Sequence, residues 1–143
     1  TVLLVSACYT IPTRETVQLS SPSTNSDCRM IKHDLGETCV PLNPKRIVVL
    51  GGLDSAIALG VKPIGAEGRI QPYFESFLSK ADLETIEPIW FEETDANLEV
   101  ILKLKPDLIL QESLGRDFQM SYQILSKIAP TVVVIRETDA DWK

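Results

Sequence analysis

The sequence of 143 residues lacks the features on which several protein classes depend. It has no apolar run near the roughly 20 residues that a membrane-spanning helix needs. Lys and Arg number only 14 and the net charge is −6, whereas binding to nucleic acid needs clustered basic side chains against the phosphates. Two Trp, three Tyr and four Phe are present, and none alternates with a basic run. We therefore exclude nucleic acid as a partner.

Residues for catalysis are equally scarce. His33 is the single histidine, and no G-x-S-x-G nucleophile elbow occurs. Gly51-Gly52 continues into neither a G-x-G-x-x-G dinucleotide motif nor a Gly-Lys-Ser/Thr phosphate loop, so a tight strand-to-helix turn explains it better. The cysteines and the histidine lack the spacing of a zinc site. We expect no catalytic residues, no cofactor and no metal site; an enzyme is the least favoured alternative.

The first of the three cysteines, Cys8, follows a short apolar run and two small residues. Val5-Ser6-Ala7-Cys8 resembles a bacterial lipobox, in which the Cys becomes the lipidated first residue of the mature protein. The next segment is rich in Ser and Thr and contains Pro12 and Pro22, a composition typical of a flexible tether. We favour a lipid anchor with a tether; a disordered tail after a chance Cys is the alternative.

The other two cysteines, Cys28 and Cys39, flank the turn formers Asp34 and Gly36 between two short extended runs. A hairpin that turns around His33-Asp34 places Cys28 opposite Cys39, where facing positions suit a disulfide. Such a bond stabilises the domain by roughly 3 kcal/mol in the chain-entropy model and indicates an oxidising compartment. Two free, half-buried thiols in a cytosolic protein are the alternative.

After this hairpin, apolar strands alternate with amphipathic helices. A parallel sheet covered on both faces explains the alternation, so we predict an α/β, Rossmann-like fold of about five strands preceded by a short β-hairpin. In one helix, Asn97 is a natural N-cap, and Leu98, Ile101 and Leu102 share a face. The expected strands are 46–50, 62–66, 86–90, 107–111 and 131–135, and the expected helices are 54–60, 72–83, 97–104 and 120–129.

In such a sheet, ligands bind outside the carboxyl ends of the strands. These ends carry an aromatic side chain, small residues and several charges, which suit a polar ligand of some size. The acidic run at 91–95 is best explained as a solvated loop. The residues at these ends are Gly51, Gly52, Leu53, Asp54, Glu67, Gly68, Arg69, Trp90, Phe91, Glu112, Ser113, Arg116 and Arg136.

Two longer motifs carry a family resemblance. The segment HDLGETCVPLNPKRIVVLGGLDSAIALGVKPIGA (33–66) and the later NLEVILKLKPDLIL (97–110) closely resemble the amino-terminal lobe of periplasmic binding proteins that take up iron siderophores and vitamin B12. The match runs from about Cys28 to Trp142 without a large gap. The resemblance implies the amino-terminal lobe of a class III periplasmic binding protein.

The resemblance implies a function in iron acquisition. Members bind a ferric siderophore, haem or cobalamin between two lobes and deliver it to the permease of an ABC transporter. Here Arg69 and Arg116 would pair with an anionic iron chelate and Trp90 would stack on it, although each Arg is equally explained as a surface charge. The implied ligand-binding residues are Leu53, Asp54, Glu67, Arg69, Trp90, Glu112, Ser113 and Arg116.

Glu99 matches the glutamate of the family that docks an arginine pocket on the permease. It lies about 100° from Leu98 on the helix and is expected to point outward. A glutamate placed favourably near a helix N-terminus is the alternative, and both roles are compatible.

The resemblance also predicts how the chain is divided. We expect residues 1–8 to be a truncated lipoprotein signal, 9–27 a tether, and 28–143 the amino-terminal lobe, with the second lobe absent. The expected protein is a monomer that captures a ferric siderophore, contacts an ABC transporter permease, and is held in the periplasm or on the outer face of the cell membrane through Cys8. A cobalamin- or haem-binding protein and an inactive fragment are the alternatives. Direct haem ligation is disfavoured, because neither Tyr73 nor His33 falls in a loop at the strand ends.

Overall fold

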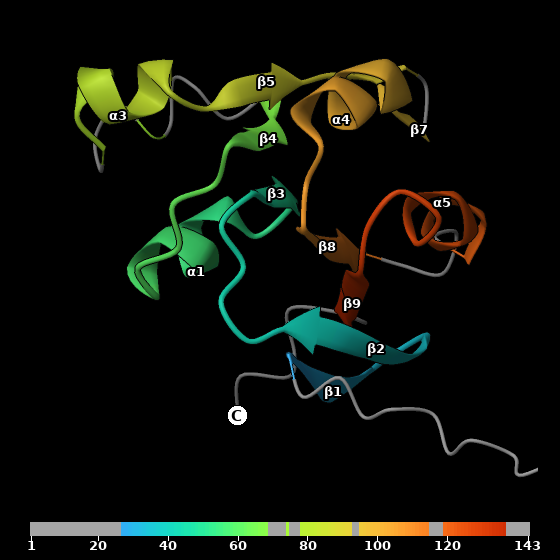
Figure 1. Ribbon diagram of the computed structural model, residues 1–143. Coiled ribbons are helices and arrows are strands. Elements are labelled where there is room, and N and C mark those ends of the chain that lie inside the picture. Colours follow the sequence, from blue (N-terminus) through green and yellow to red (C-terminus); the bar gives the residue numbers. More distant parts are fainter. Residues whose placement is uncertain (1–26, 69–73, 75–77, 93–94, 115–118, 137–143) are drawn as a thin grey trace, which may run out of the picture.

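The computed structural model describes residues 27–68, 74, 78–92, 95–114 and 119–136. Its centre is a five-stranded sheet in the order β5-β4-β3-β8-β9 (Figure 1). All neighbouring pairs are parallel, which confirms the predicted parallel sheet. The strands are β3 (Ile47–Leu50), β4 (Gly65–Glu67), β5 (Glu87–Ile89), β8 (Leu108–Leu114) and β9 (Thr131–Arg136).

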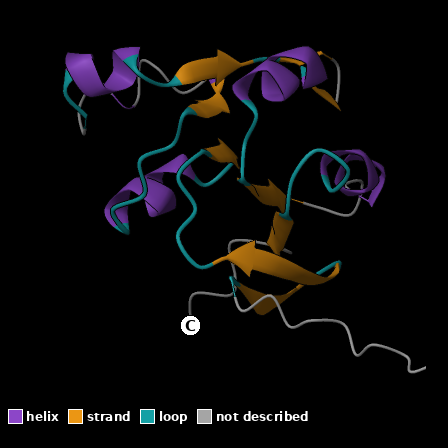
Figure 2. Ribbon diagram, viewed as in Figure 1, coloured by secondary structure: helices purple, strands orange, loops and turns teal. Residues whose placement is uncertain are grey.

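Helices cover both faces of this sheet, as the alternation predicts (Figure 2). Along β3, Val48 and Leu50 face a core cluster with α4 and α5, whereas Val49 faces a second cluster with α1 and α3. Strand residues point alternately to opposite faces, so one apolar run supplies both cores. The helices are α1 (Leu53–Ala58), α3 (Lys80–Glu84), α4 (Leu98–Leu104) and α5 (Gln119–Leu125).

Several element boundaries differ from those predicted. The strand expected at 62–66 is β4, which begins only at Gly65, after Pro63; a proline has no N–H to donate to a sheet. Of the single helix expected at 72–83, residues 72–73 and 75–77 lie outside the described residues. Its described end, α3, begins only at Lys80, because Ser79 is extended (ψ 150°) and its side chain caps α3 by accepting from the N–H of Asp82. The helix expected at 120–129 ends at Leu125 and continues as a turn.

Helix α4 confirms the predicted cap and corrects one predicted core position. The side chain of Asn97 accepts a hydrogen bond from the N–H of Val100. Leu98 and Ile101 pack into the core, but Leu102 is 56% exposed and Leu104 packs in its place. A helix advances about 100° per residue. Leu102 is therefore turned about 100° away from the buried Ile101, whereas Leu104, three residues after Ile101, returns to the buried face.

The two motifs of the resemblance meet at the amino end of the sheet. The Asp107 carboxylate accepts from the backbone N–H groups of Lys45 (2.8 Å) and Arg46 (2.9 Å). The Arg46 guanidinium donates to the carbonyls of Leu104 and Lys105, the residues that end α4. These hydrogen bonds join the start of β3 to the turn before β8, so the motif residues hold the scaffold together.

The hairpin consists of β1 (Cys28–His33) and β2 (Gly36–Pro41), and its register differs from the prediction. Cys39 lies opposite Met30, and Cys28 opposite Pro41, because the turn is centred on Asp34-Leu35. Cys28 and Cys39 are nevertheless joined by a disulfide, with their Cα atoms 5.5 Å apart. The bond therefore crosses the hairpin diagonally, between side chains on the same face.

The hairpin lies beside the outer edge of β9 (Figure 1), and its turn is hydrogen-bonded to that strand. The N–H of Asp34 donates to the carbonyl of Val133 (3.3 Å), and the Asp34 carboxylate accepts from the N–H of Ile135 (2.5 Å). The Thr38 hydroxyl donates to the carbonyl of Thr131 (2.8 Å). These bonds occupy backbone groups that an edge strand otherwise leaves unpaired. Beyond β5, β6 (Phe91–Glu92) and β7 (Asp95–Ala96) form a separate antiparallel pair.

Candidate ligand-binding rim

The carboxyl ends of the five parallel strands lie at one edge of the sheet, which we call the rim. Within the described residues the rim consists of Gly51, Gly52, Asp54, Glu67, Gly68, Trp90, Glu112, Ser113 and Arg136. The predicted ligand residues Arg69 and Arg116 lie outside the described residues, as does the predicted lipidation site Cys8. The topology therefore brings most of the predicted residues to one edge.

The turn after β3 is shaped around Glu112 of the neighbouring strand. Gly51 (φ 86°) and Gly52 (φ 64°) both adopt left-handed backbone conformations, which disfavour residues with a Cβ. A Cβ on Gly51 would lie 2.5 Å from the carbonyl oxygen of Glu112, and one on Gly52 would overlap the Glu112 carboxylate. The two glycines therefore leave the space that the Glu112 side chain fills.

Glu112 forms an ion pair with Arg136 at the end of the adjacent strand. The Glu112 side chain is only 18% exposed, whereas the Arg136 side chain is 43% exposed. Glu112 Oε1 is buried and, within the described residues, has no hydrogen bond besides this ion pair. Arg136 was predicted at a strand end but not among the implied ligand residues. The pattern that indicates it is a cation directly after an apolar, β-branched strand.

Trp90 follows β5 and is 54% exposed, consistent with the predicted place of an aromatic side chain at the rim. A Cβ on Gly68 would lie 2.8 Å from the Trp90 indole ring, so the ring rests against the backbone that ends β4. A large apolar ring exposed at a strand end is a surface on which a ligand can stack. Its packing against Gly68 holds the ring in place.

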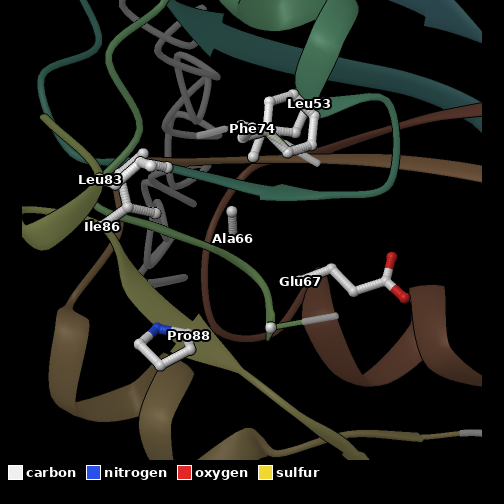
Figure 3. Close-up of a pocket in the computed structure, with 8 residues that line it drawn as sticks. Leu53, Ala66, Glu67, Phe74, Leu83, Ile86 and Pro88 are labelled. Atoms are coloured by element: carbon white, nitrogen blue, oxygen red, sulfur yellow. The ribbon is translucent and has the colours of Figure 1, made fainter. Parts of the chain in front are cut away.

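Leu53 is the predicted rim residue that the structure places in the core, with 4% exposure. It lines a small apolar pocket with Ala66, Phe74 and Leu83 (Figure 3). The pocket offers about 20 Å³, enough for one water and far below the roughly 300–1,000 Å³ of ligand sites. The carboxylate of Glu67 points away from the apolar side chains. A ligand of ordinary size therefore does not fit inside this pocket.

Asp54 and Ser113 occupy different environments at the rim. Asp54 is exposed in the first turn of α1. Ser113 is only 4% exposed, and its hydroxyl has no hydrogen-bond partner within the described residues. Two residues earlier, the Gln111 amide donates to the Ser121 hydroxyl of α5 (2.9 Å). Ser113 thus lies on the α5 side of β8, away from Glu112.

Glu99 lies on α4 and points outward, as expected. Its side chain is 76% exposed and pairs with Lys103 one turn later (2.9 Å). The hydrogen bond from Lys103 and the charge of Lys103 lower the pKa of Glu99 below its ordinary value, and Glu99 raises the pKa of Lys103. Glu99 is therefore a fully ionised, accessible carboxylate at neutral pH.

Two further properties concern metals and membranes. Over the described ranges, His, Cys, Asp and Glu do not gather in groups of three or more that could hold a metal ion. In the same part of the chain, none of the helices has the length and apolar character to cross a membrane.

His33 lies in the hairpin, where its ring contacts Thr38 (3.0 Å) and the edge of Tyr122 (centroids 5.3 Å apart).

The chain is similar in sequence to proteins named for binding siderophores or ferric citrate. The chain is 35% identical to the probable siderophore-binding lipoprotein YfiY of Bacillus subtilis over 99% of its own length and 42% of that protein. It is 35% identical to the Fe(3+)-citrate-binding protein YfmC of the same organism, over 79% of this chain and 35% of that protein. No protein-family model matches.

The fold agrees with this sequence similarity. The crystal structure of Staphylococcus aureus SirA complexed with staphyloferrin B matches with a TM-score of 0.62 and 39% identity, over 80% of this chain and 38% of SirA. The chain therefore spans about two fifths of the length of the proteins that it matches.

Proposed function

We propose that this chain binds a ferric siderophore at the rim and delivers it to a membrane permease, because it is similar to a probable siderophore-binding lipoprotein and to substrate-binding proteins of ABC transporters. The observation that carries the proposal is the match to SirA, whose crystal structure holds staphyloferrin B. The chain would act by binding alone, with no catalytic step. The homologues are substrate-binding proteins, which supports this reading.

The rim supplies chemistry that suits an iron chelate. Trp90 offers an exposed ring to an apolar or aromatic part of the ligand, and Arg136 offers guanidinium N–H groups to its oxygens. The predicted Arg69 and Arg116 would add further positive charge, and Asp54 and Glu67 would accept hydrogen bonds from ligand hydroxyl or amine groups. An open edge of this kind fits a ligand that is covered on only one side by this chain.

The test is direct binding to the purified chain. The chain is titrated with ferric citrate and with a neutral ferric trihydroxamate, and quenching of its tryptophan fluorescence gives the Kd of each chelate. The proposal predicts saturable quenching by at least one chelate and weaker quenching in Trp90→Leu. If cobalamin or haem binds and neither iron chelate does, the ligand is not a siderophore. If none of the four compounds binds, the chain is an inactive fragment.

We propose that Glu99 supplies the contact to the permease. It is exposed and ionised, so a cationic pocket on a membrane protein can reach it. Glu99→Arg should reduce uptake of the radioactive iron chelate by cells while the Kd for the chelate stays unchanged. Glu84→Arg on α3 makes the same charge change on the other face of the sheet and should leave uptake unchanged. Equal loss of chelate binding in Glu99→Arg would contradict the docking role.

Localisation rests on the lipobox and on the homologues, of which YfiY is named a lipoprotein. We propose that Cys8 carries the lipid that holds the protein at the outer face of the membrane. Cys8→Ser should move the protein from the membrane fraction to the soluble fraction of its cells. An unchanged distribution would contradict the anchor and leave the binding function untouched.

A further inference from the structure

We propose that Glu112 is a positioning residue that fixes the guanidinium of Arg136 as an anchor for a carboxylate-bearing ferric chelate. The inference rests on the proposed function and deepens it, because it names the contact and the class of chelate. The two side chains come from neighbouring strands, β8 and β9, and meet in an ion pair at the rim.

The burial of the two partners is unequal, and this inequality gives each a different role. Glu112 is 18% exposed and wedged against the Gly51-Gly52 turn, so its carboxylate has little room to move. Arg136 is 43% exposed and extends toward solvent. A guanidinium has five N–H donors in a rigid plane, so contact with one carboxylate leaves donors for a second acceptor. The buried Glu112 thus holds one side of the exposed Arg136.

A held guanidinium binds better than a free one. An arginine side chain loses rotamer freedom when it is fixed by a ligand, and the loss is smaller when the side chain is already ordered. The geometry of the fork matches a planar carboxylate, which it binds with two parallel hydrogen bonds. Because Glu112 offsets the charge of Arg136, the pair attracts a ligand by directed N–H groups more than by net charge. Carboxylate-type chelates suit this arrangement better than neutral ones.

The test is a double-mutant cycle on chelate binding by the whole chain, with ferric citrate as the probe and the neutral ferric trihydroxamate for comparison. Arg136→Gln should raise the Kd for ferric citrate about tenfold to a hundredfold, as for loss of a charged hydrogen bond. Arg136→Lys keeps the charge but loses the fork, and should still raise the Kd several-fold. Glu112→Gln should raise the Kd about threefold or more in the native background. In the Arg136→Gln background, Glu112→Gln should leave the Kd unchanged.

Controls separate this inference from a structural role and from the proposed function. Glu37→Gln removes an ion-paired carboxylate from the hairpin, remote from the rim, and should leave the Kd unchanged. A charge swap, Glu112→Arg with Arg136→Glu, should retain the urea midpoint of unfolding better than either single change but not restore binding.

Three results would overturn the inference while the proposed function stands, provided that the native chain binds ferric citrate. They are an unchanged Kd in Arg136→Gln, an equal effect of Glu112→Gln in both backgrounds, or tighter binding in Glu112→Gln. A native chain that binds the trihydroxamate but not ferric citrate overturns the chelate class. A native chain that binds neither chelate overturns the inference together with the proposed siderophore function.

Discussion

Replacing Gly52 by alanine tests the packing of the rim turn most directly. A left-handed conformation costs an L-residue about 1–2 kcal/mol, and Gly52 has φ 64°. The new Cβ would also overlap the Glu112 carboxylate, and overpacking of this kind costs a further 1–3 kcal/mol or so. We therefore expect Gly52→Ala to lower the free energy of unfolding by about 2–5 kcal/mol.

Gly60 supplies the matched control for this substitution. It has a similar left-handed conformation (φ 82°), but no atom lies within 4 Å of the position that a Cβ would take. Gly60→Ala should therefore lose only the conformational part, about 1–2 kcal/mol. Urea unfolding of the three proteins, followed by circular dichroism, gives the free energies by linear extrapolation.

A second background isolates the cause of the difference. In Glu112→Ala the carboxylate is gone, so Gly52→Ala should then cost no more than Gly60→Ala. Equal losses at Gly52 and Gly60 in the native background would refute the packing argument, as would an excess loss at Gly52 that persists without the Glu112 side chain.

Three further predictions concern the hairpin and α4. Joint replacement of Cys28 and Cys39 by serine should lower the free energy of unfolding by about 3 kcal/mol, from closure of a loop of 11 residues; unfolding in urea that is unchanged by reductant would contradict this. Asp34→Ala removes the bond to the β9 backbone and should cost about 1–3 kcal/mol and speed hydrogen exchange of the β9 amides, with Lys32→Ala as the surface control. Lys103→Met should return the lowered pKa of Glu99 toward its ordinary value in a carboxyl NMR titration. A lowered folded-state pKa stabilises the helix above the ordinary glutamate pKa, and this effect is lost as the pH falls through the lowered value; a Glu99 pKa that does not rise would exclude the ion pair as its cause.

The fold was predictable where burial imposes a period on the sequence. The apolar strand at Ile47–Leu50 supplies both cores and is recognisable from its β-branched run. Boundaries that depend on one local group were missed. The Ser79 hydroxyl caps α3, which therefore begins at Lys80 although the apolar spacing starts earlier, and β4 begins only after Pro63. The register of the hairpin was missed because Asp34 fits a turn centred one residue to either side.

The position of the rim was predictable, but the contacts between its residues were not. A parallel sheet fixes which residues reach the rim, so Trp90 and Glu112 were found from the topology alone. The pairing of Glu112 with Arg136 depends on the register of β8 against β9, which periodicity does not specify. The motifs that carry the family resemblance, around Arg46 and Asp107, stabilise the opposite end of the sheet, so they indicate the scaffold and not the ligand contacts.

The docking of the hairpin on β9 has a consequence for the order in which the chain folds. The Asp34 carboxylate bonds to a residue 101 positions later, and the Thr38 hydroxyl to one 93 positions later. The disulfide within the hairpin spans only 11 positions, so it can close before the rest of the chain has folded. The hairpin is thus among the first elements to form and among the last to dock, because its partner β9 comes late in the chain. A chain that stops before Thr131 would carry this hairpin without the β9 backbone to which it is hydrogen-bonded.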